Sequence, residues 1–163
     1  MIGLIFAQSS NGYIGKNNQL LFNIPADMKR FKETTKGNIV IMGRNTWESL
    51  PENYRPLPDR INIVLTSNRD YNAPGAFVYT NLHNAIGNLK LSGTDIWIIG
   101  GESVYKEGMF YADVLYQTFV DKEIEGDAKA PVIDDNWKLK TTSPFIKYNE
   151  LFYQFNTYIR KAS

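Results

Sequence analysis

An acidic residue, Asp27, lies in the segment 23–31, which reads Asn-Ile-Pro-Ala-Asp-Met-Lys-Arg-Phe. Pro25 is typical of the first turn of a helix. Mostly apolar side chains recur at spacings of three and four, at Ile24, Met28, Phe31 and Thr35. Asp27 falls on this face. Its carboxylate could cap free N–H groups of the first turn. It could instead face a pocket, where desolvation would raise its pKa and suit it to proton transfer.

Two further segments pass from an apolar strand through glycine into a helix, a pattern that can bind anions. Residues 39–48 run through Gly43 and Arg44, and residues 95–105 run through Gly100 and Gly101. Glycine lets a ligand approach the backbone closely, and arginine can bind a phosphate through two hydrogen bonds. In open α/β sheets, ligands bind at the carboxyl ends of strands, where both turns are expected. Plain tight turns remain the alternative, because the G-x-G-x-x-G fingerprint is not present.

The segment 8–19 is long for a connection and is rich in glycine and asparagine. Such a segment is typical either of a lid over a ligand site or of an exposed loop. His83, the one histidine, stands at the start of an expected helix and has no acid or nucleophile motif beside it. We therefore assign His83 a structural or solvated role.

The composition narrows the chemistry that these residues can perform. The 163 residues include no cysteine, which excludes disulfides, thiolate metal sites, iron–sulfur clusters and cysteine nucleophiles. One histidine excludes any site that needs two imidazoles, and we expect no metal. The formal net charge is +1 and basic residues are scattered, which argues against nucleic acid or an anionic membrane as partner. Carboxylates, hydroxyls, backbone groups or a cofactor must therefore carry any catalysis.

The elements that position these residues alternate between strand and helix. Short apolar runs bounded by Gly, Pro, Asn or Asp predict buried strands of a mostly parallel sheet at 2–7, 38–42, 61–66, 76–80 and 95–99. Helices are expected at about 25–36, 44–50, 82–91 and 102–109. Longer aromatic-rich runs at 113–120 and 151–160 predict antiparallel additions at one sheet edge, with a loop between them. No linker or repeat divides the chain, so we predict one α/β domain over residues 1–163.

Together and in this order, the segments resemble dihydrofolate reductase over nearly the whole chain. The resemblance is carried by Ile14-Gly15, residues 23–27, residues 40–49, Pro56-Leu57-Pro58 with Arg60, Ile99-Gly100-Gly101 with Tyr105, and Glu125-Gly126-Asp127. It implies a central, mostly parallel eight-stranded sheet with an antiparallel C-terminal edge strand and about four flanking helices. It also implies NADPH-dependent reduction of dihydrofolate to tetrahydrofolate.

The resemblance implies that Asp27 is catalytic. In the family this acid pairs with the 2-amino group and ring N–H of the pterin and promotes protonation at N5 before hydride reaches C6. A carboxylate matches an edge with two donors, and an apolar site favours proton uptake. Thr118 corresponds to the family threonine that bonds the carboxylate, Tyr105 would lie beside the nicotinamide ring, and Phe22 stands near the pterin.

The resemblance also implies two sets of binding residues. The substrate set is Ile5, Ala7, Leu20, Asp27, Met28, Phe31, Leu50, Leu57, Arg60 and Thr118. The NADPH set is Ala7, Ile14, Gly15, Gly43, Arg44, Asn45, Thr46, Leu65, Thr66, Ser67, Ile99, Gly100, Gly101, Glu102, Ser103, Val104 and Tyr105. Arg60 would hold the carboxylate of the glutamate tail. Arg44, Thr66 and Ser67 would receive the 2′-phosphate and so favour NADPH over NADH.

One departure from the family concerns Leu20-Leu21-Phe22, where the family usually reads Leu-Pro-Trp. Phe22 keeps an aromatic ring but lacks the indole N–H, which in the family helps to order water near the pterin. A lost hydrogen bond of this kind is worth roughly 0.5–1.5 kcal/mol. Leu21 in place of proline is expected to loosen the lid. We expect altered antifolate affinity or rate rather than loss of activity.

Two alternatives stand beside this interpretation. A related reductase of riboflavin synthesis shares the general fold and uses NADPH, but it lacks the acid at the position of Asp27. A non-catalytic binding or structural protein that keeps the fold is opposed by Asp27, Thr118, Arg60 and the double glycine together.

The partners expected are small molecules, namely dihydrofolate and antifolate inhibitors, with no nucleic acid and no membrane. No basic residue precedes the apolar run 2–7, which is also too short to span a bilayer. We therefore expect a soluble cytoplasmic protein. No extended apolar stripe remains after the core is assigned, so we expect a monomer.

Overall fold

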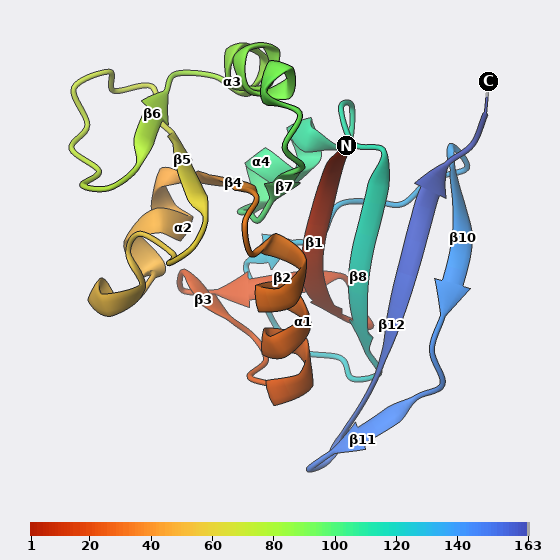
Figure 1. Cartoon of the computed structure of the whole chain (residues 1–163). Helices are drawn as coiled ribbons and strands as arrows, with labels where there is room; N and C mark the ends of the chain where they lie inside the picture. Colours follow the sequence, from red (N-terminus) through yellow and green to blue (C-terminus); the bar gives the residue numbers. More distant parts are fainter. Residues whose placement is uncertain (163) are drawn as a thin grey trace.

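The central sheet of the computed structural model, which describes residues 1–162, has nine strands (Figure 1). Neighbouring strands follow the order β10-β12-β8-β1-β7-β4-β5-β6, and β11 pairs with β12. Their bounds are β1 (Ile2–Ser9), β4 (Ile39–Gly43), β5 (Ile61–Leu65), β6 (Phe77–Tyr79), β7 (Ile96–Ile98), β8 (Val114–Val120), β10 (Trp137–Thr142), β11 (Ile146–Tyr148) and β12 (Leu151–Arg160). Every strand expected from the sequence is present. Ser163, the last residue of the expected domain, lies outside the described residues.

The strands from β8 to β6 all run parallel, as expected for most of the sheet. β12 is antiparallel to β8, and β10 pairs with it on the outer side. The expected antiparallel C-terminal strand is therefore β12, one strand in from the edge. The prediction that 113–120 is also antiparallel is wrong, because β8 pairs in parallel with β1. The helix between β7 and β8 acts as a crossover that returns the chain to the same end of the sheet.

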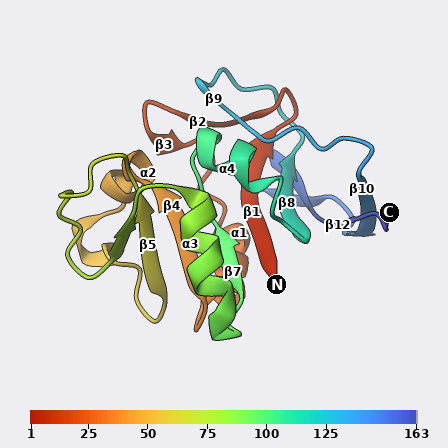
Figure 2. The ribbon, with the colours of Figure 1, turned by 90° about the horizontal axis from the view of Figure 1, so that it is seen from above.

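Four α-helices flank the sheet, as expected: α1 (Pro25–Thr35), α2 (Arg44–Ser49), α3 (Leu82–Leu89) and α4 (Glu102–Gly108). Short 3-10 turns cover Glu52–Tyr54 and Lys90–Ser92. Figure 2 shows α3 and α4 together on one side of the sheet and α1 behind it. The side chain of Asn81 caps α3 by accepting from the N–H of Asn84 at 2.8 Å.

Alternating side chains of the buried strands supply a core on each face of the sheet. One core joins Leu4 and Ile41 to residues of α3 and α4. The other joins Ile5 and Val40 to Trp47 of α2 and to residues of α1. Because successive strand residues point to opposite faces, this alternation decides which strand side chains can reach each helix. Residues on β1 and β8 at the face of the second core are those that can meet α1.

The sequence allowed residues 8–19 to form either a lid or an exposed loop. In the structure, the segment that follows β1 is not a plain loop. It forms β2 (Tyr13–Lys16) and β3 (Gln19–Leu20), which pair with β9 (Ala128–Lys129) in a second sheet of order β3-β2-β9. Asn17 and Asn18 form the turn with φ of 53° and 61°, a left-handed conformation that asparagine tolerates. The loop expected between 120 and 151 is interrupted not only by β9 but also by β10 and β11, so that prediction is wrong over much of its length. We call β2, β3 and their turn the lid hairpin.

A substitution at Gly3 of β1 can test how closely the side chains pack against the sheet. A Cβ at Gly3 would lie 2.4 Å from Cζ3 of Trp97 and 2.7 Å from its Cε3. Gly3→Ala would therefore force the indole to move within a close-packed core, and we expect the free energy of unfolding to fall by about 1–3 kcal/mol. Urea denaturation measures this loss.

Gly87→Ala is the matched control, because a Cβ there meets no heavy atom within 4 Å and the position lies inside α3. This change is expected to stabilise the protein by about 0.5–1 kcal/mol through helix propensity. Equal stability of Gly3→Ala and the parent protein would contradict the packing described for Trp97.

Candidate active site

Asp27 lies in the first turn of α1 and is bound by a residue of β8. The hydroxyl of Thr118 donates to Oδ1 of Asp27 at 2.5 Å. Thr118 is 2% exposed and Asp27 is half-buried. No side chain caps the N-terminus of α1 at Ile24. The carboxylate thus bonds to the sheet and does not cap its own helix, which argues against the helix-cap reading of Asp27.

The electrostatics of Asp27 suit a group that takes up and holds a proton. Burial raises the pKa of Asp27 above its ordinary value and outweighs the hydrogen bond from Thr118 and the charge of Arg30, which lower it. Burial first, and then the charge of Asp27, also raises the pKa of the Tyr105 phenol. That phenol stays protonated at neutral pH and donates to the carbonyl oxygen of Ile5 at 2.7 Å.

An apolar wall extends from Asp27 along α1 and the segments beside it. The expected substrate residues Ile5, Phe31, Leu50 and Leu57 belong to one cluster. Leu57 is fixed there by the buried amide of Asn62. The Oδ1 of Asn62 accepts from the Leu57 N–H at 2.9 Å, and its Nδ2 donates to the Leu57 carbonyl at 3.0 Å.

The remaining apolar residues expected at the substrate are not joined to this wall. Leu20 of the lid hairpin is 75% exposed and Met28 is 49% exposed, so both present free apolar surface. Phe22 packs in a separate cluster with Ile24, Val120 and Tyr153, which anchors the chain between the lid hairpin and α1.

Arg60 lies at the far end of the apolar wall from Asp27. Its Nε donates to the carbonyl of Pro58 at 2.8 Å, and its Nη1 donates to the hydroxyl of Thr35 at 3.1 Å. The guanidinium carbon lies 5.8 Å from the ring centroid of Phe31. No Nη2 hydrogen bond occurs within residues 1–162, so this oriented cation can bind an anionic group of a ligand.

The residues expected at NADPH gather along the carboxyl edge of neighbouring strands. β1, β7, β4 and β5 are adjacent in the sheet. Their ends, and the starts of α2 and α4 that follow two of them, carry Ala7, Gly43, Arg44, Asn45, Thr46, Leu65, Thr66, Ser67, Ile99, Gly100, Gly101, Glu102, Ser103, Val104 and Tyr105. Ile14 and Gly15 lie on β2 of the lid hairpin. Segments far apart in sequence thus form one continuous edge.

The glycines along this edge leave space that side chains would fill. The Gly43 N–H donates to the Gly100 carbonyl at 2.9 Å. A Cβ at Gly43 would lie 3.2 Å from Cγ2 of Val104, and one at Gly100 or Gly101 would lie 3.5 Å from Oγ1 of Thr46. Gly100 has a φ of +127°, which glycine adopts readily, and the Gly100–Gly101 peptide bond is cis. This backbone-lined cradle fits the phosphates of a dinucleotide.

Arg44 and Glu102 have protein partners at this edge. Nη1 of Arg44 lies 3.3 Å from both carboxylate oxygens of Glu48, and Glu48 accepts from the Tyr71 hydroxyl at 2.6 Å. The Glu102 carboxylate accepts from the N–H of Lys129 at 2.7 Å, so it joins α4 to β9. An incoming phosphate at Arg44 would therefore compete with an exposed, solvent-screened ion pair.

The lid hairpin is tied to the segment around Asp127. The Asp127 N–H donates to the Gly15 carbonyl at 3.0 Å, and the Asp127 carboxylate accepts from the Asn17 N–H at 3.0 Å. A Cβ at Gly126 would lie 2.7 Å from the Gly15 oxygen, so only glycine fits this approach. On its other side, the hairpin turn and α2 line a cavity of about 320 Å³. The lid hairpin therefore borders the edge that carries the cofactor residues.

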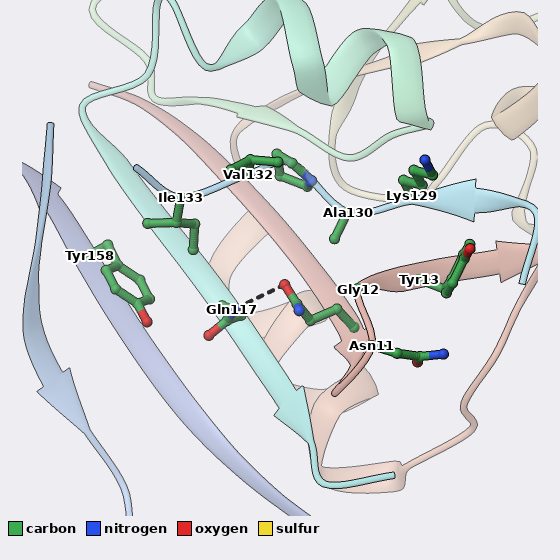
Figure 3. A pocket seen from close by; sticks show the side chains of 11 residues that line it. Asn11, Gly12, Tyr13, Gln117, Lys129, Ala130, Val132, Ile133 and Tyr158 are labelled. Carbon is green, nitrogen blue, oxygen red and sulfur yellow. Dashed lines mark hydrogen bonds between the residues drawn. The ribbon is translucent and has the colours of Figure 1, made fainter. Parts of the chain in front are cut away.

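A cavity of about 520 Å³ lies away from Asp27 (Figure 3). Gln8, Gln117 and Tyr158 form its floor, and residues around Ala130 and Ile133 form a wall. It lies on the face of the sheet covered by α3 and α4, whereas Thr118 and Asp27 are on the opposite face.

In the part of the chain that the structure describes, neither His83 nor a group of metal-ligating side chains forms a second reactive centre. His83 is exposed on α3, and its Nδ1 lies 3.2 Å from the Tyr111 hydroxyl, in keeping with a structural role. Within residues 1–162, no three His, Cys, Asp or Glu side chains are grouped as a metal site would require. In the same part of the chain, no helix has the length and apolar character needed to cross a membrane.

Comparison with known proteins places this geometry in a family. Residues 1–160 match the family model described as dihydrofolate reductase. The chain is 40% identical over 163 residues to dihydrofolate reductase of Mycobacterium leprae (strain TN), with 98% of each chain covered. It is 39% identical over 166 residues to that of Bacillus subtilis (strain 168), with 100% of this chain and 96% of the relative covered. The chain belongs to the dihydrofolate reductase family.

A solved structure extends this finding to the fold. Dihydrofolate reductase from Enterococcus faecalis, complexed with NADP(H) and RAB-propyl, has a TM-score of 0.91 and 36% sequence identity. The match covers 99% of this chain and 97% of the other. The family, the fold class and the reductase activity inferred from the sequence are thereby confirmed.

For several residues that shape this dihydrofolate reductase site, the sequence did not reveal the role or the partner, even where the residue itself stood in a motif. Asn62 holds Leu57, Asp127 and Glu102 hold the lid hairpin and β9, and Arg30 lies beside Asp27. A polar residue inside an apolar strand, as at Asn62, was a signal available in the sequence. The partners of Asp127, Glu102 and Arg30 lie on other elements, and local spacing does not report them.

Asp27 also makes stability depend on pH. Its pKa is raised in the folded state, so the folded chain holds this proton to higher pH than the unfolded chain. Its stabilising contribution is present below the unfolded pKa and is lost as pH rises through the folded pKa. Asp27→Asn keeps an acceptor for Thr118 but cannot ionise. We expect Asp27→Asn to melt at a higher temperature than the parent at about pH 8, with the difference shrinking at about pH 5.

Thermal unfolding followed by circular dichroism across this pH range measures the difference. Glu33→Gln, at an exposed position of the same helix whose carboxylate forms only a surface ion pair with Lys29, is the control. A constant difference between Asp27→Asn and the parent at all pH values would show that burial does not destabilise the ionised carboxylate.

Proposed function

We propose that this chain reduces dihydrofolate to tetrahydrofolate with NADPH, and that Asp27 promotes protonation of the substrate at N5. The observation that carries the role of Asp27 is the hydrogen bond that its half-buried carboxylate accepts from the buried Thr118. Burial raises the pKa of Asp27 and so favours proton uptake at this position, from which the proton can reach the substrate directly or through water.

The substrate binds with its pterin edge against Asp27. The ionised carboxylate accepts from the 2-amino group and the ring N–H, a match of two acceptors to two donors. Ile5, Phe31, Leu50 and Leu57 enclose the rings with Leu20, Met28 and Phe22 at the open side, and Ala7 lies opposite Thr118 in the register of β1 and β8. Arg60 binds the glutamate carboxylate, because Thr35 and Pro58 already orient its guanidinium.

The cofactor lies along the carboxyl edge of β1, β7, β4 and β5. NADPH, when bound, supplies the hydride. The backbone of Gly43, Gly100 and Gly101 and the hydroxyl of Thr46 hold the phosphates, and the lid hairpin with Ile14 and Gly15 covers the nicotinamide end. Tyr105 forms the wall beside that ring, fixed by its bond to the Ile5 carbonyl. Arg44, Thr66 and Ser67 receive the 2′-phosphate, with the remaining residues of the NADPH set supporting these contacts.

We further propose a cytoplasmic monomer that binds antifolates in the substrate cleft. The exposed apolar side chains of Phe77, Leu91, Phe110 and Val132 lie on separate segments, and scatter of this kind argues against an interface at those positions. Light scattering at assay concentrations measures the oligomeric state.

The role of Asp27 predicts the kinetics of Asp27→Asn. Without an ionisable carboxyl, the turnover number for dihydrofolate at neutral pH is expected to fall by about 10²–10⁴-fold. The residual rate is expected to rise as pH falls, because solution acid then supplies the proton. Loss of NADPH absorbance measures both. Binding of NADPH alone should be unaltered in this variant, and an undiminished rate would remove the proposed role of Asp27.

The proposed binding of the 2′-phosphate by Arg44 predicts a preference for NADPH over NADH. Arg44→Gln is expected to raise the KM for NADPH by about 10- to 100-fold, because a charge-assisted contact to the 2′-phosphate is lost. The KM for NADH, which has no such phosphate, should be unchanged and serves as the internal control. Equal increases for both cofactors would show that Arg44 acts on the fold of the turn and not on the phosphate.

A further inference from the structure

Arg30 lies one turn after Asp27 on α1 and is held between two aromatic rings. Its guanidinium carbon is 4.5 Å from the ring centroid of Tyr116 on β8 and 4.7 Å from that of Phe155 on β12. Both rings attract the cation through their π faces. The side chain is therefore fixed between α1 and the sheet, on the side of the helix where Asp27 meets Thr118.

The positive charge of Arg30 is not neutralised by a close acid. Its Nη1 is buried and has no hydrogen-bond partner among residues 1–162, and its Nη2 reaches the hydroxyl of Thr157 only at 3.5 Å. The ion pairs in the described part of the chain involve Met1, Lys29 and Arg44 and leave Arg30 out. Burying a guanidinium whose N–H groups have no partner costs free energy. An interaction that offsets this cost is therefore expected for Arg30 beside Asp27.

The negative charge that acts on the Arg30 guanidinium is that of the Asp27 carboxylate. Burial lowers the pKa of Arg30, whereas Tyr116 and Asp27 act in the opposite direction. In return, the charge of Arg30 lowers the pKa of Asp27 against the larger effect of burial. The two side chains therefore interact through space, without a direct hydrogen bond.

We propose that Arg30 is a positioning residue that sets the working pH range of the reductase, by keeping the Asp27 carboxylate ionised for substrate binding. This proposal rests on the role given above to Asp27. A protonated Asp27 would present an O–H to the two-donor edge of the pterin and lose one acceptor. Burial alone would favour that neutral form over a wide pH range, and the fixed cation behind the carboxylate opposes it.

Among residues 1–162, Arg30 is the charged side chain that acts on Asp27, and Thr118 is the hydrogen-bond partner of Asp27. From β8, Thr118 and Tyr116 face the pair, and from β12, Phe155, Thr157 and Tyr153 do so; none of these is an Asp, Glu, Lys, Arg or His. Tyr105 of α4 is held by the Ile5 carbonyl and stays neutral. Lys29 is exposed and pairs with Glu33 at 3.9 Å on α1. Removing Arg30 therefore changes the charge next to Asp27 with no other ionised group to replace it.

The test compares three variants of the intact enzyme with one control. Arg30→Gln and Arg30→Met remove the charge, and Met also keeps packing against both rings. Arg30→Lys keeps the charge. Lys32→Gln removes the same charge from an exposed position of α1, where water and salt screen it. Side-chain carboxyl ¹³C NMR, with the Asp27 signal assigned by its loss in Asp27→Asn, reports the titration of Asp27 without any need for catalysis.

We expect the Asp27 titration midpoint to rise by about one pH unit in Arg30→Gln and Arg30→Met. Arg30→Lys should stay near the parent protein, and Lys32→Gln should match it. The pH profile of kcat/KM for dihydrofolate should move by the same amount in the same direction, whereas a purely structural role would lower the rate at every pH without moving the midpoint.

Two results separate this inference from the proposed function. An unchanged Asp27 titration in both neutral variants would overturn the role of Arg30, whatever the rates. A shifted titration with an unshifted pH–rate profile would support the action of Arg30 on Asp27 and overturn the role of Asp27 in protonating the substrate.

Discussion

The burial of one carboxylate, Asp27, is the constraint around which this site is built. An ionised acid in an apolar cleft is costly unless other groups stabilise it. Here Thr118 donates a hydrogen bond from β8, and Arg30 contributes a positive charge from the same helix. The Thr118 bond and the packing of Arg30 against Tyr116 and Phe155 tie α1 to the sheet. The acid proposed to serve the chemistry therefore also helps to fix the helix that carries it.

The proposed function divides the site into a substrate half and a cofactor half, which would recognise their ligands by different means. The substrate half relies on side chains of α1 and its neighbours, where a carboxylate and the Arg60 guanidinium stand at opposite ends of an apolar wall. The cofactor half relies on backbone exposed by Gly43, Gly100 and Gly101 at the carboxyl edge of parallel strands. This edge is continuous only because the sheet order brings β1, β7, β4 and β5 side by side.

Local sequence patterns were sufficient to predict most of the helices and strands of the fold. The apolar runs 38–42 and 95–99 predicted the buried strands that the structure has at Ile39–Gly43 and Ile96–Ile98, because both faces of these strands are covered. The patterns failed for β2, β3 and β9, which are two to four residues long, and for β10 and β11, whose side chains are mostly exposed. For the first three, long-range contacts decide. Their pairing comes from contacts between the lid hairpin and Asp127, more than a hundred positions apart. The direction of β8 was also missed, because alternation along a strand does not state which neighbour it will have.

By itself, the sequence determined the types and local spacing of the reactive residues: an acid on an apolar helical face, glycines between strand and helix, and too few histidines and no cysteines for other chemistry. Tertiary structure alone decided what Asp27 does with its carboxylate. Spacing allowed a helix cap or a pocket, and the choice depends on Thr118, which lies 91 positions away. The same holds for Arg30. A basic residue on a helix is ordinarily solvated, but here Tyr116 and Phe155 from two strands of the sheet enclose the guanidinium. Burial and charge act through space, and only the fold brings distant residues within their range.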